Sequence, residues 1–257
     1  MSLKILQINV GRSESSHDPA LATAEQRDVH LVLLQEPNKA YATRQNLITD
    51  DNQDTAIFCR NKDAGVESHD VGRGYAVVHF RSFALYNCYV SPNSTLRDFE
   101  RIIDTIMNSI RTDKKAAVVV GDLNAKSYLW GYAVEDGRGE YIADWLNALD
   151  MAFGNSGNSP TFVRGNSESI MDITFATSTI FEKLVNWEVL QQESLSHHRY
   201  IYFEIEDERR APRKTRPCKP KINKEIFKSV IEILEPNIGH SNTKLIQIIM
   251  KAKKASQ

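Results

Sequence analysis

Up to residue 207 the chain contains many short stretches in which apolar and polar residues alternate or apolar residues run together. Residues 4–10 alternate, which is typical of a strand with one buried face. Residues 29–35 form a nearly continuous apolar run, which indicates a fully buried strand. The same criteria, with many Val, Tyr and Phe, predict further strands at residues 56–60, 75–80, 83–90, 116–120, 161–163, 171–175, 185–189 and 200–205.

Three other segments have helical spacing. Asp18 and Pro19 predict the N-cap and first turn of a helix that reaches about residue 26. Thr95 and Asp98 resemble a capping box, and the apolar residues that follow repeat at helical spacing to Ile110. A third helix has an apolar face made of Tyr141, Ile142, Trp145, Leu146 and Leu149. Many strands with two or three long helices predict an α/β sandwich of two packed sheets with helices outside.

The composition changes after residue 207. Residues 209–228 contain nine Lys and Arg, one Glu and three prolines, a mixture that resists compact folding. We therefore expect a folded domain over residues 1–207 and a basic, proline-containing tail, partly disordered, over residues 208–257. A solvated linker is favoured over a dedicated nucleic-acid arm for this tail.

The bulk composition, with 41% hydrophobic and 25% charged residues, is that of an ordinary globular protein. No apolar run approaches the roughly 20 residues that a membrane span needs, so no membrane partner is expected. The first ten residues alternate like a strand and do not resemble a signal peptide. Three scattered cysteines are too few for a disulfide framework or a zinc cluster, which favours reduced thiols in an intracellular protein.

Charge is distributed unevenly along the chain. Residues 209–257 hold 13 of the 32 Lys and Arg but only three of the 33 Asp and Glu, so the preceding part is acidic. An acidic body is not typical of a protein that coats DNA, because phosphate neutralisation dominates such binding. It suits an enzyme that places carboxylates around a metal and holds DNA by local contacts.

Polar residues stand at the ends of several predicted strands. Asn9 ends the first strand, and Glu36 directly follows the second. Functional groups of α/β folds gather beyond the C-terminal ends of strands, although a single Glu there is often only solvated. As a ligand, Glu36 would suit Mg²⁺, which prefers hard oxygen donors.

Asp122 and Asn124 follow the strand at residues 116–120. One interpretation is a simple Asx turn, and the other is a base, Asp122, beside a hydrogen-bonding group, Asn124, that orients water or phosphate. Asp172 lies inside an apolar strand, where it is costly unless paired. A histidine opposite it, from the pair His197 and His198, would be held in one tautomer and favoured in its protonated, phosphate-stabilising form. The alternative for two adjacent histidines is a soft-metal site.

Seven short motifs in this order resemble the endonuclease/exonuclease/phosphatase superfamily, which includes exonuclease III-like AP endonucleases and DNase I. They are Gln-Ile-Asn (7–9), Leu-Leu-Gln-Glu (33–36), Tyr-Val-Ser-Pro (89–92), Gly-Asp-Leu-Asn-Ala-Lys (121–126), Pro-Thr-Phe (160–162), Ser-Ile-Met-Asp (169–172) and Ser-His-His (196–198). The resemblance covers about residues 3–206. It implies a DNase I-like fold, a four-layered α/β sandwich of two packed mixed sheets flanked by helices.

Within that superfamily the chain is most similar to endonucleases of non-LTR retrotransposons. Asn-Ala-Lys-Ser-Tyr-Leu-Trp-Gly (124–131) is close to that group's extension, and Gly-Arg-Gly-Glu (137–140) fits it as well. The resemblance implies nicking of double-stranded DNA in the nucleus after synthesis in the cytoplasm. The nick would leave a 3′-hydroxyl that primes reverse transcription, with element RNA and a C-terminal reverse transcriptase beyond the tail as partners.

The resemblance also implies roles for residues at matching positions. Glu36 would bind the metal, Mg²⁺ or alternatively Mn²⁺, with Asn9 beside it. Asp122 would activate the attacking water, and Asn124 would orient that water or contact the scissile phosphate. Tyr89 would hydrogen-bond the phosphate.

Asp172 would orient His198, which would stabilise charge developing on the phosphoryl oxygens. His197 departs from the family pattern, which has Asp there, so a hard oxygen ligand or a partner of the metal is replaced by imidazole. This change would lower activity or shift the preference towards Mn²⁺. His197 and Arg164, which lies in a hairpin-like segment, are candidate substrate contacts, although Arg164 is equally compatible with a solvated hairpin.

Three alternatives remain open at this point. An AP endonuclease or exonuclease III-like repair enzyme would share the chemistry and prefer abasic sites. A phosphatase of the same superfamily would act on free phosphoesters. A catalytically weakened DNA- or protein-binding module would bind without cleaving under any divalent metal.

Overall fold

The computed structural model describes residues 2–206, so the tail expected at residues 208–257 and its boundary lie outside the described residues. The first of two six-stranded sheets has the order β13-β14-β1-β2-β4-β3. Its strands are β1 (Ser2–Asn9), β2 (Leu31–Gln35), β3 (Ile48–Thr49), β4 (Thr55–Cys59), β13 (Leu184–Val189) and β14 (Ile201–Glu206). Because β1 pairs parallel with β2 and antiparallel with β14, this sheet is mixed.

The second sheet has the order β5-β6-β7-β8-β12-β9. Its strands are β5 (Ser68–Gly72), β6 (Tyr75–His79), β7 (Phe83–Tyr89), β8 (Ala116–Asp122), β9 (Met151–Phe153) and β12 (Asp172–Thr177). It is also mixed, because β7 and β8 are parallel while β12 runs antiparallel to β8. A separate hairpin joins β10 (Phe162–Arg164) to β11 (Ser167–Ser169).

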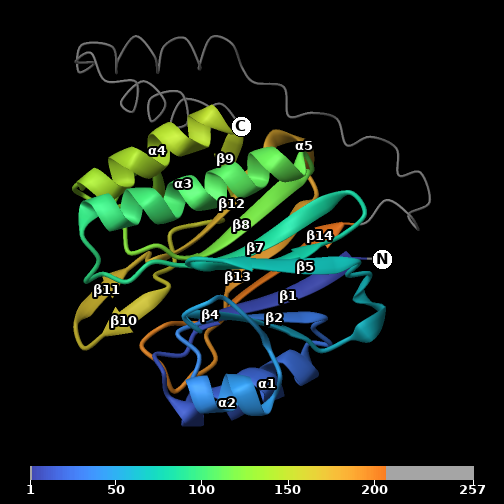
Figure 1. Cartoon of the computed structure of the whole chain (residues 1–257). Coiled ribbons are helices and arrows are strands. Elements are labelled where there is room, and N and C mark those ends of the chain that lie inside the picture. Colours follow the sequence, from blue (N-terminus) through green and yellow to red (C-terminus); the bar gives the residue numbers. More distant parts are fainter. Residues whose placement is uncertain (1, 207–257) are drawn as a thin grey trace, which may run out of the picture. The chain divides into compact units, whose positions relative to one another are not determined.

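Helices cover the outer faces of both sheets. The helices are α1 (His17–Gln26), α2 (Lys39–Arg44), α3 (Leu96–Asp113), α4 (Gly137–Ala148) and α5 (Ser178–Phe181), with 3₁₀ turns η1 (Glu14–Ser16), η2 (Lys62–Ala64) and η3 (Tyr128–Trp130). Figure 1 shows α1 and α2 on the outer side of the first sheet and α3 and α4 on the outer side of the second. This arrangement confirms the predicted four-layered sandwich. No helix among residues 2–206 is long and apolar enough to span a membrane.

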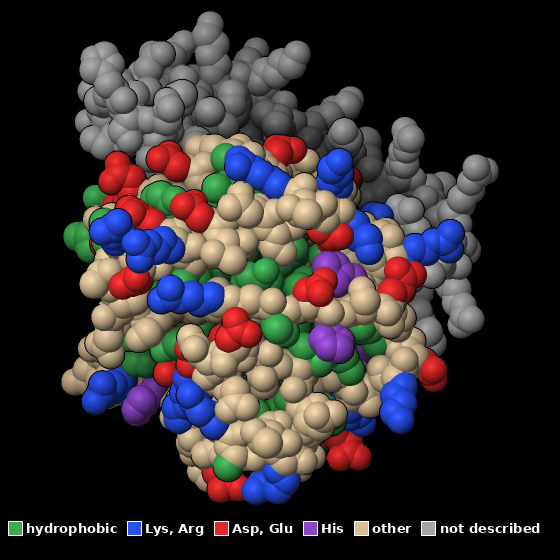
Figure 2. Space-filling view, viewed as in Figure 1, with side chains coloured by type: hydrophobic (Ala, Val, Ile, Leu, Met, Phe, Trp, Pro, Cys, Tyr) green, Lys and Arg blue, Asp and Glu red, His purple; other side chains and the backbone are tan. Residues whose placement is uncertain are grey.

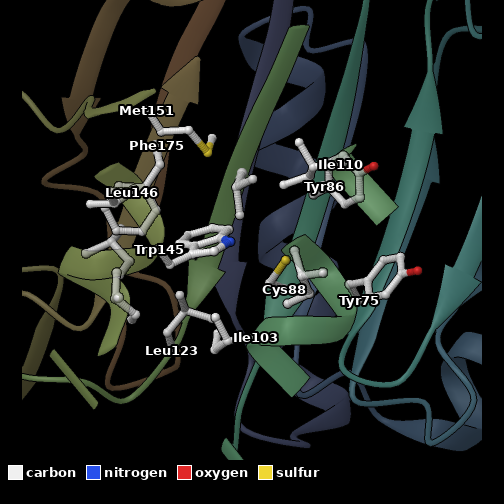
Figure 3. Close-up of a cluster of buried hydrophobic side chains, with 14 of the residues drawn as sticks. Tyr75, Tyr86, Cys88, Ile103, Ile110, Leu123, Trp145, Leu146, Met151 and Phe175 are labelled. Carbon is white, nitrogen blue, oxygen red and sulfur yellow. The ribbon is translucent and has the colours of Figure 1, made fainter. Parts of the chain in front are cut away.

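Strand alternation explains how the layers pack. In β7, Phe83 and Leu85 belong to the buried cluster between the two sheets, whereas Tyr86 and Cys88 belong to the cluster between the second sheet and its helices. The second cluster is drawn in Figure 3, where its side chains lie between the strands and the helices. One apolar strand can thus serve two cores, because successive side chains point to opposite faces.

The start of α3 is as predicted, and the start of α1 differs. Thr95 Oγ1 accepts a hydrogen bond from the amide of Asp98 at 3.2 Å. This bond, from the N-cap side chain to the first turn, is one of the two bonds of the predicted capping box and is confirmed. The helix expected to begin at Asp18 instead has Ser16 as its N-cap, because the turn η1 runs directly into α1. Pro19 is tolerated inside the first helical turn, where the missing N–H would have no intrahelical partner.

Candidate active site

Polar side chains from both sheets meet at one edge of the sandwich. Asn9 ends β1 and Glu36 follows β2, and these strands are parallel neighbours in the first sheet. In the second sheet, Tyr89 and Asp122 are register partners at the ends of parallel strands, and Asp172 pairs with Asp122 at the start of antiparallel β12. Strand direction therefore brings all five predicted positions to the same edge.

Asn9 connects the two sheets at this edge. Its Nδ2 donates to Glu36 Oε2 at 3.2 Å and to Asp122 Oδ2 at 3.0 Å. Its Oδ1 accepts a hydrogen bond from the amide of Gly11 at 2.9 Å. Because an amide NH₂ has two hydrogens, Asn9 uses both on carboxylates from different sheets and fixes their separation.

His198 lies between two buried aspartates. Its Nδ1 is 2.8 Å from Asp172 Oδ2, and its Nε2 is 3.8 Å from Asp122 Oδ2. Asp122, Asp172 and His198 are 2%, 1% and 8% exposed, so water screens these charges little. Phe162 packs its ring 4.9 Å from the imidazole in an edge-on arrangement, which helps to hold the ring in place.

The charges at this edge are unbalanced. Burial disfavours protonated His198, but the neighbouring Asp172, followed by Asp122, raises its pKa to about 9. Burial and the charge of Asp172 raise the pKa of Asp122 above its usual range. Three carboxylates, including Glu36, therefore face one imidazolium, which leaves an excess of negative charge.

The cluster has the chemistry of a divalent-metal site. Asp122, Asp172 and His198 offer ligand atoms within 4.8 Å of one another, so this part of the described chain could hold a metal ion. Asp172 Oδ1 is buried without a hydrogen-bond partner among the described groups. Protonated His198 has no free lone pair, so carboxylate oxygens are the better ligands, and hard oxygens suit Mg²⁺. Glu36 and Asn9, the predicted metal residues, lie beside this cluster rather than inside it.

Tyr89 and Asn124 border the carboxylates. Tyr89 is 5% exposed, and burial together with its hydrogen bond to Glu36 raises its pKa, so the hydroxyl remains a proton donor. The amide of Asn124 donates to Asp122 Oδ1 at 3.1 Å, which is the Asx turn that the sequence left open. Asn124 Nδ2 donates to the carbonyl of Val90 at 3.1 Å, so its side-chain donor holds the neighbouring loop.

The two predicted substrate contacts are exposed and lie outside the buried cluster. Arg164 ends β10, and its side chain makes no hydrogen bond or ion pair within residues 2–206. His197 presents its ring 6.0 Å from that of Phe162, and its carbonyl accepts from the amide of Val163 at 2.8 Å. The hairpin is thus tied to the segment that carries His198. On the face in Figure 2, basic and acidic side chains are interspersed.

Two small hydroxyl residues position the cluster and were not predicted as site residues. Thr161 Oγ1 accepts from the amides of Met171 and Asp172, each at 3.0 Å. Ser196 Oγ donates to the carbonyl of Asn9 at 2.7 Å and accepts from the amide of His198 at 3.2 Å. Both residues belong to motifs identified in the sequence, and that membership was the available signal.

Comparisons with known proteins agree with this geometry. Residues 83–202 match the family model described as endonuclease-reverse transcriptase. No curated protein matches the chain. Among solved structures, the chain is similar to the endonuclease domain of TRAS1, a telomere-specific non-LTR retrotransposon, with a TM-score of 0.65 and 24% identity over 80% of this chain and 98% of that chain. The structural similarity confirms the DNase I-like fold, and the family match agrees with the resemblance that the sequence motifs indicate.

Proposed function

Because residues 83–202 match the endonuclease–reverse transcriptase family model and the chain has a DNase I-like fold, we propose that this chain nicks double-stranded DNA. The reaction is divalent-metal-dependent hydrolysis of a phosphodiester bond. The buried line of Asp172, His198 and Asp122, joined through Asn9 to Glu36, is the observation that carries this proposal.

Glu36 is the residue that would hold the metal, with Asn9 beside it, since Glu36 presents a carboxylate oxygen at this edge and Asn9 Nδ2 donates to it at 3.2 Å. When bound, Mg²⁺ supplies positive charge that polarises a phosphoryl oxygen and offsets the negative charge of the cluster. Mn²⁺ would serve in the same place, because it also accepts oxygen donors and tolerates nitrogen better.

Asp122 accepts the proton of the attacking water. Its carboxylate is held from two sides, by Asn9 Nδ2 at Oδ2 and by the amide of Asn124 at Oδ1, so these two bonds fix its orientation. A general base of this kind contributes about 10²- to 10⁴-fold to a rate.

His198 and Tyr89 stabilise the charge that develops on the phosphoryl oxygens. The bond to Asp172 fixes the imidazole ring and leaves Nε2 directed towards the side of Asp122. Tyr89 adds a hydroxyl donor from the adjacent strand end. Donors that are fixed before the substrate binds need no reorganisation during the reaction, which is why they are effective.

The exposed hairpin and segment 196–198 contact the DNA. Arg164 is free to pair with a backbone phosphate. His197 lies next to the hairpin, because the amide of Val163 donates to the carbonyl of His197. Contacts of this kind position the duplex and carry little sequence information.

The biological reaction is a nick whose 3′-hydroxyl primes reverse transcription of a non-LTR retrotransposon. The similarity to the TRAS1 endonuclease domain and the matched family description support this assignment. A reverse transcriptase joined beyond the tail and the element RNA would be the partners. Synthesis would occur in the cytoplasm and cleavage of chromosomal DNA in the nucleus.

Nicking of supercoiled plasmid with Mg²⁺, and separately with Mn²⁺, tests the proposed activity. We expect open-circle product from the wild type, a loss of about 10²-fold or more in His198→Ala, and a gain in His197→Asp, which restores an oxygen donor. His79→Ala is the matched control, because His79 also lies between two aspartates, Asp70 at 3.0 Å and Asp113 at 3.2 Å, at the other end of the sheet.

The same assay separates the alternatives. If the wild type and His197→Asp both bind plasmid but leave it intact with either metal, the chain is a binding module and the proposed activity is wrong. A preference for a duplex with an abasic site over an intact duplex would identify a repair enzyme instead.

A further inference from the structure

Arg138, in the first turn of α4, joins two loops of the active-site edge. Its Nη1 donates to the carbonyls of Ser91 and Asn124, both at 3.2 Å. Its Nη2 donates to the carbonyl of Pro92 at 3.2 Å and to the carbonyl and hydroxyl of Ser94 at 2.6 and 3.0 Å. The planar fork of a guanidinium is suited to such convergent acceptors, whereas an ammonium is not.

These loops carry the proposed catalytic groups. The segment at residues 90–95 directly follows Tyr89, and the segment at residues 123–127 directly follows Asp122. The loops are also bonded to each other, because the amide of Val90 donates to the carbonyl of Asp122 at 3.1 Å. Arg138 thus fixes, from behind, the two loops that orient Tyr89 and Asp122.

The position of Arg138 is itself determined by close packing. Its guanidinium lies 5.0 Å from the centre of the buried Phe99 ring. Asp136 Oδ1 accepts from the amides of Lys126 and Gly139 at 3.1 and 2.8 Å, which docks the start of α4 on the second loop. A Cβ on Gly139 would lie 1.9 Å from the carbonyl oxygen of Lys126, so only glycine permits this approach.

The bonding pattern of Arg138 differs from that of three arginines elsewhere in the fold. Arg12, Arg27 and Arg44 each pair with a carboxylate. Every hydrogen bond that Arg138 makes within residues 2–206 ends on a neutral oxygen. The four hydrogens of Nη1 and Nη2 are shared among five neutral acceptors, which is typical of a group that fixes geometry.

We propose that Arg138 is a positioning residue for DNA cleavage, acting through the loops at residues 90–95 and 123–127. This inference rests on the proposed function and extends it to a residue that does not touch the reacting atoms. It predicts that the geometry of the guanidinium, and not its charge alone, supports the reaction rate.

Arg138→Lys and Arg138→Met separate geometry from charge, because lysine keeps the charge and methionine keeps only the apolar length. Arg27→Lys and Arg27→Met are the matched controls. The Arg27 guanidinium lies 5.1 Å from the centre of the Tyr202 ring and pairs with Glu188. The backbone carbonyl of Arg27 accepts from Lys4 Nζ near the start of β1, far along that strand from Asn9.

In plasmid nicking by folded protein, both Arg138 variants should lose about 10- to 100-fold in kcat, since small displacements of reacting groups have effects of this size. KM and DNA affinity without metal should change less than threefold. The Arg27 variants should cleave like the wild type. A double-mutant cycle with Tyr89→Phe should be non-additive, because both changes act on one loop. Wild-type kcat in Arg138→Lys would show that charge suffices and would overturn the positioning role.

Amide hydrogen exchange gives a readout that does not need activity. Exchange at residues 90–95 and 123–127 should be faster in both Arg138 variants than in the wild type, while α1 should be unchanged. Unchanged exchange in those loops would overturn the proposal. If the wild type nicks no DNA with any metal, the proposed function fails, and exchange in the two loops still decides whether Arg138 fixes them.

Discussion

The space between the two sheets is apolar at one end and polar at the other, although the same strands build both ends. Where β1 and β7 begin, Leu3, Phe83 and Leu85 pack in a buried apolar cluster. Where β2 and β7 end, Gln35 and Asn87 are fully buried in the same space, directly behind the active-site edge. The comparison indicates that the apolar end stabilises the fold, while the polar end supports the side chains of the candidate active site.

At the polar end, hydrogen bonds join the two sheets but leave some of the buried polar groups unpaired. Gln35 Nε2 donates to Asn87 Oδ1 at 2.5 Å, and Asn87 Nδ2 donates to the carbonyls of Leu34 and Ala56 at 3.0 and 2.9 Å. Both polar atoms of Gln7 and the Oε1 of Gln35 are buried without partners among the described residues. Each unpaired buried group costs about 1–3 kcal/mol, so we expect the polar end to contribute less to the free energy of unfolding than the apolar end.

Asp122→Asn should show the largest difference between the two ends. The nicking rate should fall by about 10²- to 10⁴-fold, because the proposed base is lost. The free energy of unfolding in metal-free buffer should stay equal or rise, since burial and Asp172 already disfavour the Asp122 carboxylate. Plasmid nicking and urea unfolding measure the two effects. A clear loss of stability would mean that the polar end also supports the fold.

Leu85→Ala should have the opposite effect at the apolar end. Leu85 is 0% exposed in the cluster between the sheets, so its truncation should lower the free energy of unfolding by about 2–5 kcal/mol. The nicking rate per folded molecule should remain within about threefold of the wild type, because effects of distant sites are largely independent. Urea unfolding and nicking at low temperature test this. A collapse of kcat in folded protein would contradict the division into two ends.

Divalent metal should stabilise the polar end specifically. At a Mg²⁺ concentration 100 times the dissociation constant, a single site adds about 2.7 kcal/mol to stability. Thermal melts with and without Mg²⁺ should show this rise for the wild type and for Leu85→Ala, but not for Glu36→Gln. If Mg²⁺ raises the melting temperature of Glu36→Gln as much as that of the wild type, Glu36 is not a metal ligand, and Asp122 and Asp172 become the favoured ligands.

The smallest effect is expected for Asn87→Leu, which changes the contact between the sheets. Loss of the amide leaves Gln35 without its acceptor, so stability should fall by about 1–3 kcal/mol. The double variant Gln35→Leu/Asn87→Leu should recover part of that loss and still nick about tenfold more slowly, because the spacing of Asn9 and Asp122 depends on how the sheets meet. Full activity in the double variant would show that the amides serve stability alone.

The sequence predicted those elements whose burial leaves a periodic pattern. The central strands β1, β2, β7 and β8 could be found because apolar residues fill one or both of their faces. The edge strand β5 was missed, since four of its five residues are exposed and no alternation marks it. Helix α2 has only six residues, too few to show a helical period.

The candidate site could be predicted as a set of residues but not as a set of contacts. The rule about strand ends points to Asn9, Glu36 and Asp122 without any structure. The bond from Asn9 to Asp122, 113 residues apart, depends on how the two sheets pack, which no local pattern contains. His197 and His198 are neighbours in sequence, yet His197 is exposed at the end of a bend and His198 is buried where it forms an isolated bridge with Phe162, which no local pattern predicts.

The order in which the ribosome makes this chain gives the bond between Ser196 and Asn9 a further meaning. The two residues are 187 positions apart, and β14, the last strand described, pairs with β1, the first. During translation, β2 can pair with β1 early, whereas His198 and β14, the neighbour of β1 on its other side, emerge only when almost the whole domain has been made. A nascent or truncated chain that stops before this point lacks His198 and the bond between Ser196 and Asn9, so the candidate site assembles only after these last segments of the domain have been made.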